Sequence, residues 1–233
     1  MDFNTLTDII EWDVLNWGEL IYNFDALLCT LPSNAKILAI GERNGGLSLW
    51  LALKGFHVIC SDRIEFSNYT YQLHEKYNVS HLITYKTLDI LNLSESEDYY
   101  DLVIFKSVLG GVKSEYHNAN TRDFQTRQNA INNIFKILKK GGYLYITENL
   151  EGNVLHKMGR YFFRKNKGWH YITISELKLL FKRFELVEIK TFGVFYTIFK
   201  NNKINKMFYN INKFVNNLLP SNYKYIGMVM CKK

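Results

Sequence analysis

The sequence contains little cysteine and no long apolar run, and both absences narrow the class of protein. Its 233 residues include three cysteines, which lack metal-ligand spacing and cannot all pair within one chain. No stretch reaches the roughly 18 consecutive apolar residues that a membrane-spanning helix needs. The N-terminal residues 1–13 are acidic and lack the basic and apolar pattern of a secretory signal. We therefore expect a cytoplasmic protein without a metal site.

The sequence has fewer acidic than basic residues. The chain has 29 lysines and arginines against 22 aspartates and glutamates, which is a net charge of +7. An excess of positive charge favours anionic partners, although it also serves solubility alone. The charge by itself therefore leaves both interpretations open.

From residue 36 onward, short apolar segments alternate with helical ones. This alternation is typical of βαβ units and predicts an α/β fold with a parallel sheet. The expected strands cover residues 36–40, 57–62, 82–89, 101–107, 142–149, 185–192 and 224–233. The expected helices between them cover residues 47–55, 67–77, 124–140 and 174–184.

Three segments fall outside this alternation. The pattern predicts one or two helices in residues 1–31 and an additional amphipathic helix in residues 196–219. Strand signals are absent from residues 150–173. Ligands of open α/β sheets bind at the carboxyl ends of the strands, so insertions after those ends are natural lids. The length suits a single domain over residues 1–233. In this domain we expect residues 1–31 and 150–173 to cover a core of residues 36–149.

A glycine-rich segment, GERNGG (41–46), follows the first expected strand. Glycine allows the backbone to approach a ligand closely because it lacks a Cβ atom and accepts positive φ. Asp62 ends the next strand about 20 residues later, where an acid can accept both hydroxyls of a ribose. Arg43 replaces the middle glycine of a dinucleotide motif, and no G-K-[ST] follows for a P-loop. A nucleoside joined to an amino acid is compatible with this pattern.

The order of these motifs resembles that of class I, Rossmann-like S-adenosylmethionine-dependent methyltransferases. Residues 37–63 resemble the first motif of that family, DLVIFKSVLGG (101–111) its fourth-strand signature, and LKKGGYLYITEN (138–149) its turn into the fifth strand. The resemblance covers roughly residues 36–192. It implies a mostly parallel seven-stranded sheet with helices on both faces, S-adenosylmethionine as methyl donor and S-adenosylhomocysteine as product.

The resemblance also implies a set of cofactor-binding residues. An acid after the second strand would bind the ribose, and an acid after the third would approach the adenine. Ala39 and Arg43 stand where the family usually has an acid and a glycine, so other loop groups would hold the methionine end. A charged side chain that ends an apolar strand, such as Lys106, is costly unless it is solvated or used. The expected cofactor-binding residues are Gly41, Glu42, Arg43, Gly45, Asp62, Arg63, Asp89, Ile90, Lys106 and Trp17.

The acceptor side has a second resemblance. Residues 148–173 resemble the cap over the acceptor pocket in small-molecule methyltransferases from bacterial surface-polysaccharide gene clusters, and residues 11–17 resemble the helix that these enzymes fold over the cofactor. Gly110 and Gly111 replace the family's frequent acid–histidine pair. Candidate catalytic residues are therefore His156, Glu148 and His117. Candidate acceptor-binding residues are Arg160 and Arg164 as an anion clamp, and Trp169, Tyr171 and Trp12 as flat walls. For each of them a purely structural or solvated role is the alternative.

These features predict O- or N-methyl transfer to a small anionic metabolite, such as a phosphorylated or nucleotide-linked sugar. One alternative is a nucleic-acid methyltransferase, and another is a non-catalytic domain that binds a cofactor or partner. The D/N-P-P-Y/F turn used with a flipped adenine is absent, so we do not expect a nucleic-acid partner. For residues 196–219, a lid, a homodimer contact and membrane docking remain open.

Overall fold

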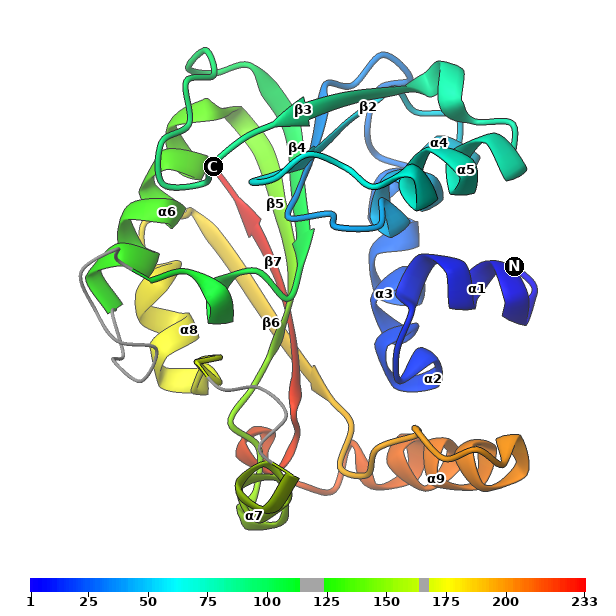
Figure 1. The fold of residues 1–233 in the computed structure, drawn as a ribbon. Helices are drawn as coiled ribbons and strands as arrows, with labels where there is room; N and C mark the ends of the chain where they lie inside the picture. Colours follow the sequence, from blue (N-terminus) through cyan, green and yellow to red (C-terminus); the bar gives the residue numbers. More distant parts are fainter. Residues whose placement is uncertain (114–123, 164–167) are drawn as a thin grey trace.

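A seven-stranded sheet runs through the middle of the molecule (Figure 1). The computed structural model describes residues 1–113, 124–163 and 168–233. The strand order is β3-β2-β1-β4-β5-β7-β6, in which the first five strands are parallel and β7 is antiparallel to both its neighbours. The predicted mostly parallel sheet is confirmed. The strands are β1 Ile37–Ile40, β2 Val58–Asp62, β3 Ile83–Thr87, β4 Tyr100–Lys106, β5 Leu138–Asn149, β6 Leu186–Phe192 and β7 Ile226–Lys232.

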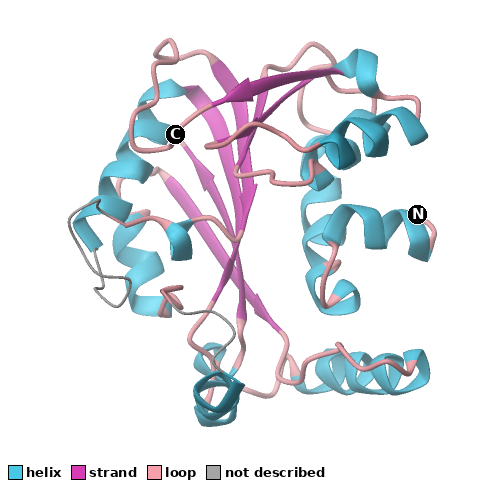
Figure 2. Cartoon of the chain, in the orientation of Figure 1, coloured by secondary structure: helices cyan, strands magenta, loops and turns pink. Residues whose placement is uncertain are grey.

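Helices cover both faces of this sheet (Figure 2). Helices α1, α3, α4 and α5 pack on one face, and α6 and α8 on the other. Ile37 and Ala39 face the first core and Leu38 and Ile40 the second, so β1 is apolar throughout. The helices are α1 Phe3–Ile10, α2 Val14–Trp17, α3 Glu19–Leu28, α4 Gly46–Leu53, α5 Asn68–Lys76, α6 Phe124–Ile137, α7 Val154–Phe163, α8 Ile174–Leu180 and α9 Asn202–Val215, with short 3-10 turns η1 Ser80–Leu82, η2 Leu109–Gly111 and η3 Ser221–Tyr223.

Strand β5 begins four residues earlier than the sequence pattern predicts. Leu138 pairs with Tyr100, whereas Tyr143 pairs with Leu102, so the register shifts between the two pairs. Gly141 lies in this interruption with φ of 78°. The buried Leu138 therefore joins the sheet directly after α6, although the helical pattern continues through residue 140.

The three segments outside the sheet are largely helical. Residues 1–31 contain α1, α2 and α3, residues 150–173 contain α7, and residues 196–219 contain α9. Helices α7 and α9 lie at the end of the sheet where β5 and β6 end (Figure 1). Within the described residues, no helix is long and apolar enough to span a membrane. The single-domain organisation and the lid and cap roles stay predictions.

A buried polar network ties α9 to α2 and to the start of β7. The Asn212 side-chain oxygen accepts the backbone N–H groups of Val194 at 3.1 Å and Phe195 at 2.9 Å. The Asn212 amide nitrogen donates to Asn16 Oδ1 at 2.9 Å, and Asn16 Nδ2 donates to Tyr225 Oη at 2.7 Å. Both asparagines are fully buried, and buried amides are normally hydrogen-bonded. The network thereby fixes the rotation of α9.

Replacing Asn212 tests this network. We expect Asn212→Ala to lower the free energy of unfolding by about 2–3 kcal/mol, because it removes the side-chain acceptor of two backbone N–H groups and the donor to the buried Asn16 Oδ1. Urea titration measures the loss. Asn210→Ala, an exposed position on the same helix, is the control and should change stability by less than about 0.5 kcal/mol. Equal losses in both variants would argue against the network.

Candidate functional site

A cavity of about 780 Å³ lies where β1, β4 and β5 end. Open α/β sheets bind ligands at this edge, and the volume suits a small molecule. One wall comes from the glycine loop and α4, a second from the ends of β4 and β5, a third from residues 168–169, and the N-terminal segment 9–12 supplies the fourth. The lining residues are Ile9, Glu11, Trp12, Gly41, Glu42, Arg43, Gly46, Leu47, Lys106, Ser107, Gly111, Lys113, Asn149, Gly168 and Trp169.

The glycine loop after β1 is tightly packed against its neighbours. Gly41 has φ of 67°, and a Cβ atom there would lie 2.5 Å from Val108 Cγ2. A Cβ atom on Gly46 would lie 2.1 Å from the carbonyl oxygen of Ile9. The end of α1 therefore rests directly on the loop. The carbonyl of Gly45 lies 2.9 Å from His74 Nε2, which holds the loop from the α5 side.

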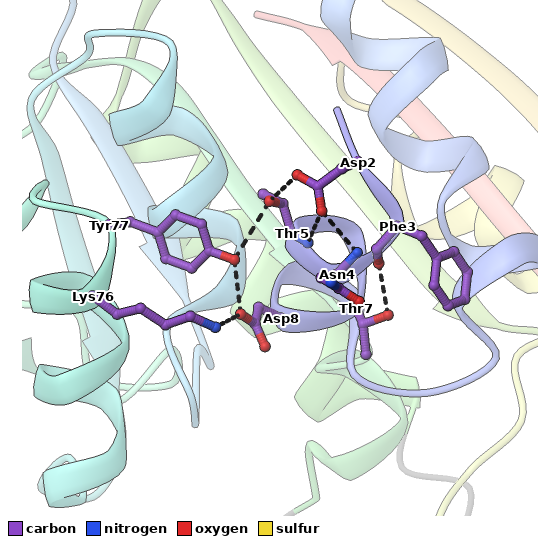
Figure 3. Close-up of polar contacts among 8 residues, drawn as sticks. All are labelled: Asp2, Phe3, Asn4, Thr5, Thr7, Asp8, Lys76 and Tyr77. Atoms are coloured by element: carbon purple, nitrogen blue, oxygen red, sulfur yellow. Dashed lines mark hydrogen bonds and ion pairs between the residues drawn. The ribbon is translucent and has the colours of Figure 1, made fainter.

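Helix α1 is held in this place by α5 (Figure 3). Asp8 accepts from Lys76 Nζ at 2.5 Å and from the Tyr77 hydroxyl at 2.8 Å. Asp2 caps the first turn of α1 by accepting the backbone N–H groups of Asn4 at 2.9 Å and Thr5 at 3.0 Å. The chain thus builds a roof over the loop from its own N-terminal residues.

Glu42 is the buried acid of the loop. Its carboxylate accepts the backbone N–H of Ser48 at 2.8 Å, in the first turn of α4, where a negative charge is favoured. Burial nevertheless raises the pKa of Glu42 to about 7, against the lowering effect of the Ser48 hydrogen bonds and of Lys106. Its charge state therefore changes near neutral pH.

Asp62 and Arg43 interact with each other and with the roof. Asp62 Oδ2 accepts the backbone N–H of Arg43 at 2.7 Å, while Oδ1 has a longer bond of 3.3 Å from Ile64 N–H. The Arg43 guanidinium pairs with Glu11 and lies 5.8 Å from the centre of the Trp12 ring. One Asp62 oxygen therefore shapes the loop, and the other is engaged only by a long bond.

Six predicted cofactor residues are not among the lining residues of the cavity: Gly45, Trp17, Asp62, Arg63, Asp89 and Ile90. Asp62 and Arg63 lie at the end of β2, and Arg63 is exposed. Asp89 follows β3 and accepts the N–H of Leu91 at 2.9 Å, and Ile90 is buried beside it. Their roles toward ribose and adenine stay predictions.

Lys106 ends β4 beneath the N-terminal segment. Its Nζ donates to the carbonyl of Ile10 at 2.9 Å and lies 3.7 Å from the centre of the Trp12 ring. Burial lowers the pKa of Lys106 to about 8, although Glu11 and Glu42 raise it. Lys106 lines the cavity and also holds the end of α1 through its bond to Ile10, and its role toward the cofactor stays a prediction.

The opposite end of the cavity is formed by Ser107, Asn149 and Trp169. Asn149 Nδ2 donates to Ser107 Oγ at 2.7 Å, and Ser107 has an unusual φ of 55°. The Trp169 indole lies on η2, because a Cβ atom on Gly110 would be 2.2 Å from its Nε1. This buried Nε1 has no hydrogen-bond partner among the described residues. The glycine pair thus makes room for an aromatic wall.

Two predicted site residues belong to the core instead. His156 Nε2 lies 2.9 Å from the carbonyl of Val194, and Nδ1 accepts the N–H of Asn153 at 3.1 Å. Burial lowers the pKa of His156 to about 4. His156 is not among the lining residues of the cavity, and its role as a proton acceptor stays a prediction. Trp17 is only 2% exposed and packs edge-on against Trp12. It supports a cavity wall and does not line the cavity.

The other catalytic candidate among the described residues, Glu148, is not among the lining residues of the cavity either. Glu148 is fully buried, and its Oε1 accepts the N–H groups of Val108 and Leu109, both at 2.7 Å. Burial raises the pKa of Glu148 to about 7. It does not line the cavity but holds the start of η2, and its role as a proton acceptor stays a prediction. His117 lies outside the described residues.

Arg160, half of the predicted anion clamp, lies away from the lining of the cavity. The Arg160 guanidinium lies 3.9 Å from the centre of the Tyr171 ring and donates to the carbonyl of Glu151. Neither Arg160 nor Tyr171 lines the cavity, so α7 does not supply the expected clamp there. Arg164 lies outside the described residues. Trp169 and Trp12 do line the cavity.

Sequence reasoning missed four polar lining residues: Glu11, Ser107, Lys113 and Asn149. Ser107 and Asn149 follow Lys106 and Glu148 at the carboxyl ends of two neighbouring strands, so strand order alone could have indicated them. Glu11 and Lys113 lie in loops, and only the fold shows that these loops reach the cavity.

The geometry agrees with comparisons to known proteins. The sequence model of a family described as "Methyltransferase domain" matches residues 18–190, and the chain belongs to this family. The protein is an S-adenosylmethionine-dependent methyltransferase. No curated protein is significantly similar to its sequence.

Solved structures share the fold. A methyltransferase from Methanosarcina mazei is 21% identical, with 89% of this chain and 96% of that chain covered and a TM-score of 0.57. A methyltransferase from Archaeoglobus fulgidus is 14% identical over 93% and 94%, with a TM-score of 0.61. The phosphoethanolamine N-methyltransferase 2 of Haemonchus contortus is 14% identical over 93% of this chain, with a TM-score of 0.64. This chain covers 52% of that protein.

The loop residues fit the methionine end of S-adenosylmethionine, which carries one ammonium and one carboxylate. Glu42 and Glu11 provide acidic groups at the cavity, and Arg43 and Lys106 provide basic ones. Gly41 allows the backbone to turn here where a Cβ atom would meet Val108. The chain therefore offers both signs of charge around the cavity.

Gly46→Ala tests the contact between roof and loop. The new methyl group has no room beside the Ile9 carbonyl, so the roof must move away. We expect affinity for S-adenosylhomocysteine to fall by about tenfold or more, since displacement of a binding wall by about 1 Å is costly. Calorimetry measures the affinity. Gly159→Ala, where the Cβ atom meets nothing within 4 Å, should leave it unchanged. Unchanged affinity in Gly46→Ala would contradict the roof.

Glu148→Gln tests the burial of this carboxyl group. Its pKa is raised from 4.5 to about 7 in the fold, so Glu148 contributes stability below pH 4.5 that is lost as pH rises through 7. An amide can still accept both N–H groups but does not titrate. We expect wild type to lose stability relative to Glu148→Gln by on the order of 2 kcal/mol between pH 5 and 8. Parallel stability curves in urea titrations would refute the shifted pKa.

Proposed function

We propose that this methyltransferase modifies an oxygen or nitrogen atom of a small anionic metabolite. A phosphorylated or nucleotide-linked sugar, of the kind used for surface polysaccharides, is the acceptor class. The observation that carries the proposal is that one cavity extends from the charged glycine-loop wall to a second wall of different chemistry, formed by Ser107, Asn149, Trp169 and Lys113.

The second wall suits a sugar-like acceptor. The Ser107 hydroxyl and the Asn149 amide are hydrogen-bonding groups for acceptor hydroxyls, and the Trp169 indole is a flat apolar surface. Lys113 is exposed at the cavity and supplies the positive charge for a phosphate group.

An anionic acceptor has a parallel on the same fold. The Haemonchus contortus enzyme was solved with phosphomonomethylethanolamine, a small phosphorylated compound. That likeness is one of fold, so it supports the acceptor class only by analogy. The nucleic-acid alternative is less well supported, because the proposed acceptor wall is a small set of polar groups beside Trp169.

Positioning supplies the catalysis in this proposal. S-adenosylmethionine provides a methyl group on a positively charged sulfur. The methionine end of this donor is held by Glu42, Arg43 and Lys106. The segment 9–12 covers the cavity and excludes water, and the acceptor atom is oriented by Ser107 and Asn149. No histidine lines the cavity within the described part of the chain, so His117 stays a candidate proton acceptor by sequence alone. A cytoplasmic location and a homodimer also stay predictions.

Lys113→Gln tests the acceptor class. A panel of sugar phosphates, nucleotide sugars and their neutral parent sugars is assayed by release of S-adenosylhomocysteine. We expect turnover of anionic acceptors, with KM raised about tenfold by Lys113→Gln and KM for S-adenosylmethionine unchanged, because one charge-assisted hydrogen bond is lost. Lys182→Gln, an exposed lysine beyond α8, is the matched control. Equal turnover of neutral sugars, or an unchanged acceptor KM, would refute the anionic acceptor.

A further inference from the structure

Helix α9 exposes its apolar side chains and buries polar ones. Met207, Ile211 and Phe214 form one outward stripe at helical spacing, and Leu218 continues it just beyond the helix. Phe214 is 76% exposed and Leu218 is 68% exposed. The inward stripe, by contrast, contains the buried Asn205 and Asn212, with Phe208 and Tyr209 partly buried between them. This is the reverse of an ordinary surface helix.

Hydrogen bonds fix this orientation. Asn205 accepts the N–H of Phe199 and donates to its carbonyl, both at 2.8 Å. Asn212 accepts from Val194 and Phe195 and donates to Asn16. A rotation that turned the apolar stripe inward would break these bonds and leave buried amides unpaired. The outward apolar stripe is therefore built into the fold.

Lysines flank the apolar stripe on one side of the helix. Lys203, Lys206 and Lys213 are exposed, and within the described chain they form no ion pair of the kind found elsewhere on the surface. No acidic side chain follows Glu188 in the sequence. The α9 surface, defined as Met207, Ile211, Phe214, Leu218 and these three lysines, is therefore apolar and basic at once.

Other exposed apolar side chains lie at the same end of the sheet. Helix α7 lies at the same end of the sheet and exposes Val154, Leu155 and Met158 (Figures 1 and 2). Ile198 and Phe199, which precede α9, are also exposed. So much apolar area at one end of a molecule indicates an interaction site.

We propose that the α9 surface docks this methyltransferase on an anionic lipid membrane. A helix that lies in a membrane interface buries an apolar stripe among the lipid chains and keeps lysines at the phosphate level. On α9, the apolar stripe meets the first requirement and the lysines beside it meet the second. The docking does not depend on the acceptor proposed above.

The charge argues for lipid over other occupants. A second copy of this chain would bring the same unpaired lysines face to face, and like charges repel. A nucleic acid would use the lysines but would leave Met207, Ile211 and Leu218 without a partner, because it is bound through phosphate contacts and aromatic stacking. An anionic bilayer satisfies both the lysines and the aliphatic side chains.

Buried hydrogen bonds also connect the α9 surface to the N-terminal segment that lines the cavity. The network that holds α9 includes Asn16, and Asp13 beside it accepts from Thr197, which precedes α9. Asp13 directly follows Trp12, which lines the cavity. The membrane-facing helix and the cavity roof are thus joined by buried hydrogen bonds.

Vesicle flotation of the full-length protein tests the proposal. We expect the protein to float with phosphatidylglycerol vesicles, to float much less with phosphatidylcholine vesicles, and to be released by salt. The double variant Phe214→Ser, Leu218→Ser should lower partitioning by about tenfold or more, since two large side chains lose their burial. Each of Lys203→Gln, Lys206→Gln and Lys213→Gln should lower it about fivefold on the anionic vesicles only.

Leu179→Ser is the matched control, because Leu179 is an exposed leucine on α8, a helix on the opposite face of the sheet. It should float as wild type does, and urea titration confirms that all variants fold. Absence of wild-type flotation would overturn the proposal, and so would equal flotation of the Leu179 and Phe214/Leu218 variants. Sedimentation that finds a dimer dissolved by the double variant, without vesicle binding, would assign the surface to a second copy instead.

Discussion

The buried hydrogen bonds around Asp13 and Asn16 are the constraint on which the functional end of this methyltransferase depends. Burial raises the pKa of Asp13, and hydrogen bonds from Thr197, Tyr225 and Asn16 oppose that effect. Such a network is stable only when every member is satisfied. Its partners come from α2, from the chain before α9 and from the start of β7. It therefore joins the two ends of the sequence and sets both the cavity roof and the outward face of α9.

The N-terminal segment over the cavity is held in place by the Lys106 ammonium group, which contacts residues of this chain. Lys106 is at the end of β4, where a ligand group could engage it, yet it already donates to Ile10 and lies on Trp12. Arg43 likewise pairs with Glu11. Both cations remain at the cavity wall, so a bound carboxylate would meet charges that are already positioned. The same contacts connect donor binding with the placement of the N-terminal segment.

Several site residues could be predicted because their positions follow from strand order. Gly41, Glu42 and Lys106 come directly after or at the end of central strands, and such residues must meet at one edge of a parallel sheet. The sequence did not indicate that His156 and Trp17 lie in the core, because a titratable or aromatic side chain in a segment near the site looks the same in sequence whether it faces a ligand or the core. Only the backbone partners of His156 and the burial of Trp17 separate the two cases.

The sequence by itself determined the order of strands and helices and the glycine loop after β1, because apolar periodicity and glycine placement are local properties of the chain. The methyl donor followed from the resemblance of the ordered motifs to a known family. Tertiary structure alone decided which side chains from distant segments line the cavity and which way α9 faces. Trp169 reaches the cavity because Gly110 leaves space on η2, and the apolar stripe of α9 faces outward because Asn205 and Asn212 are hydrogen-bonded inside. Those outcomes depend on contacts between residues far apart in sequence, which no local pattern records.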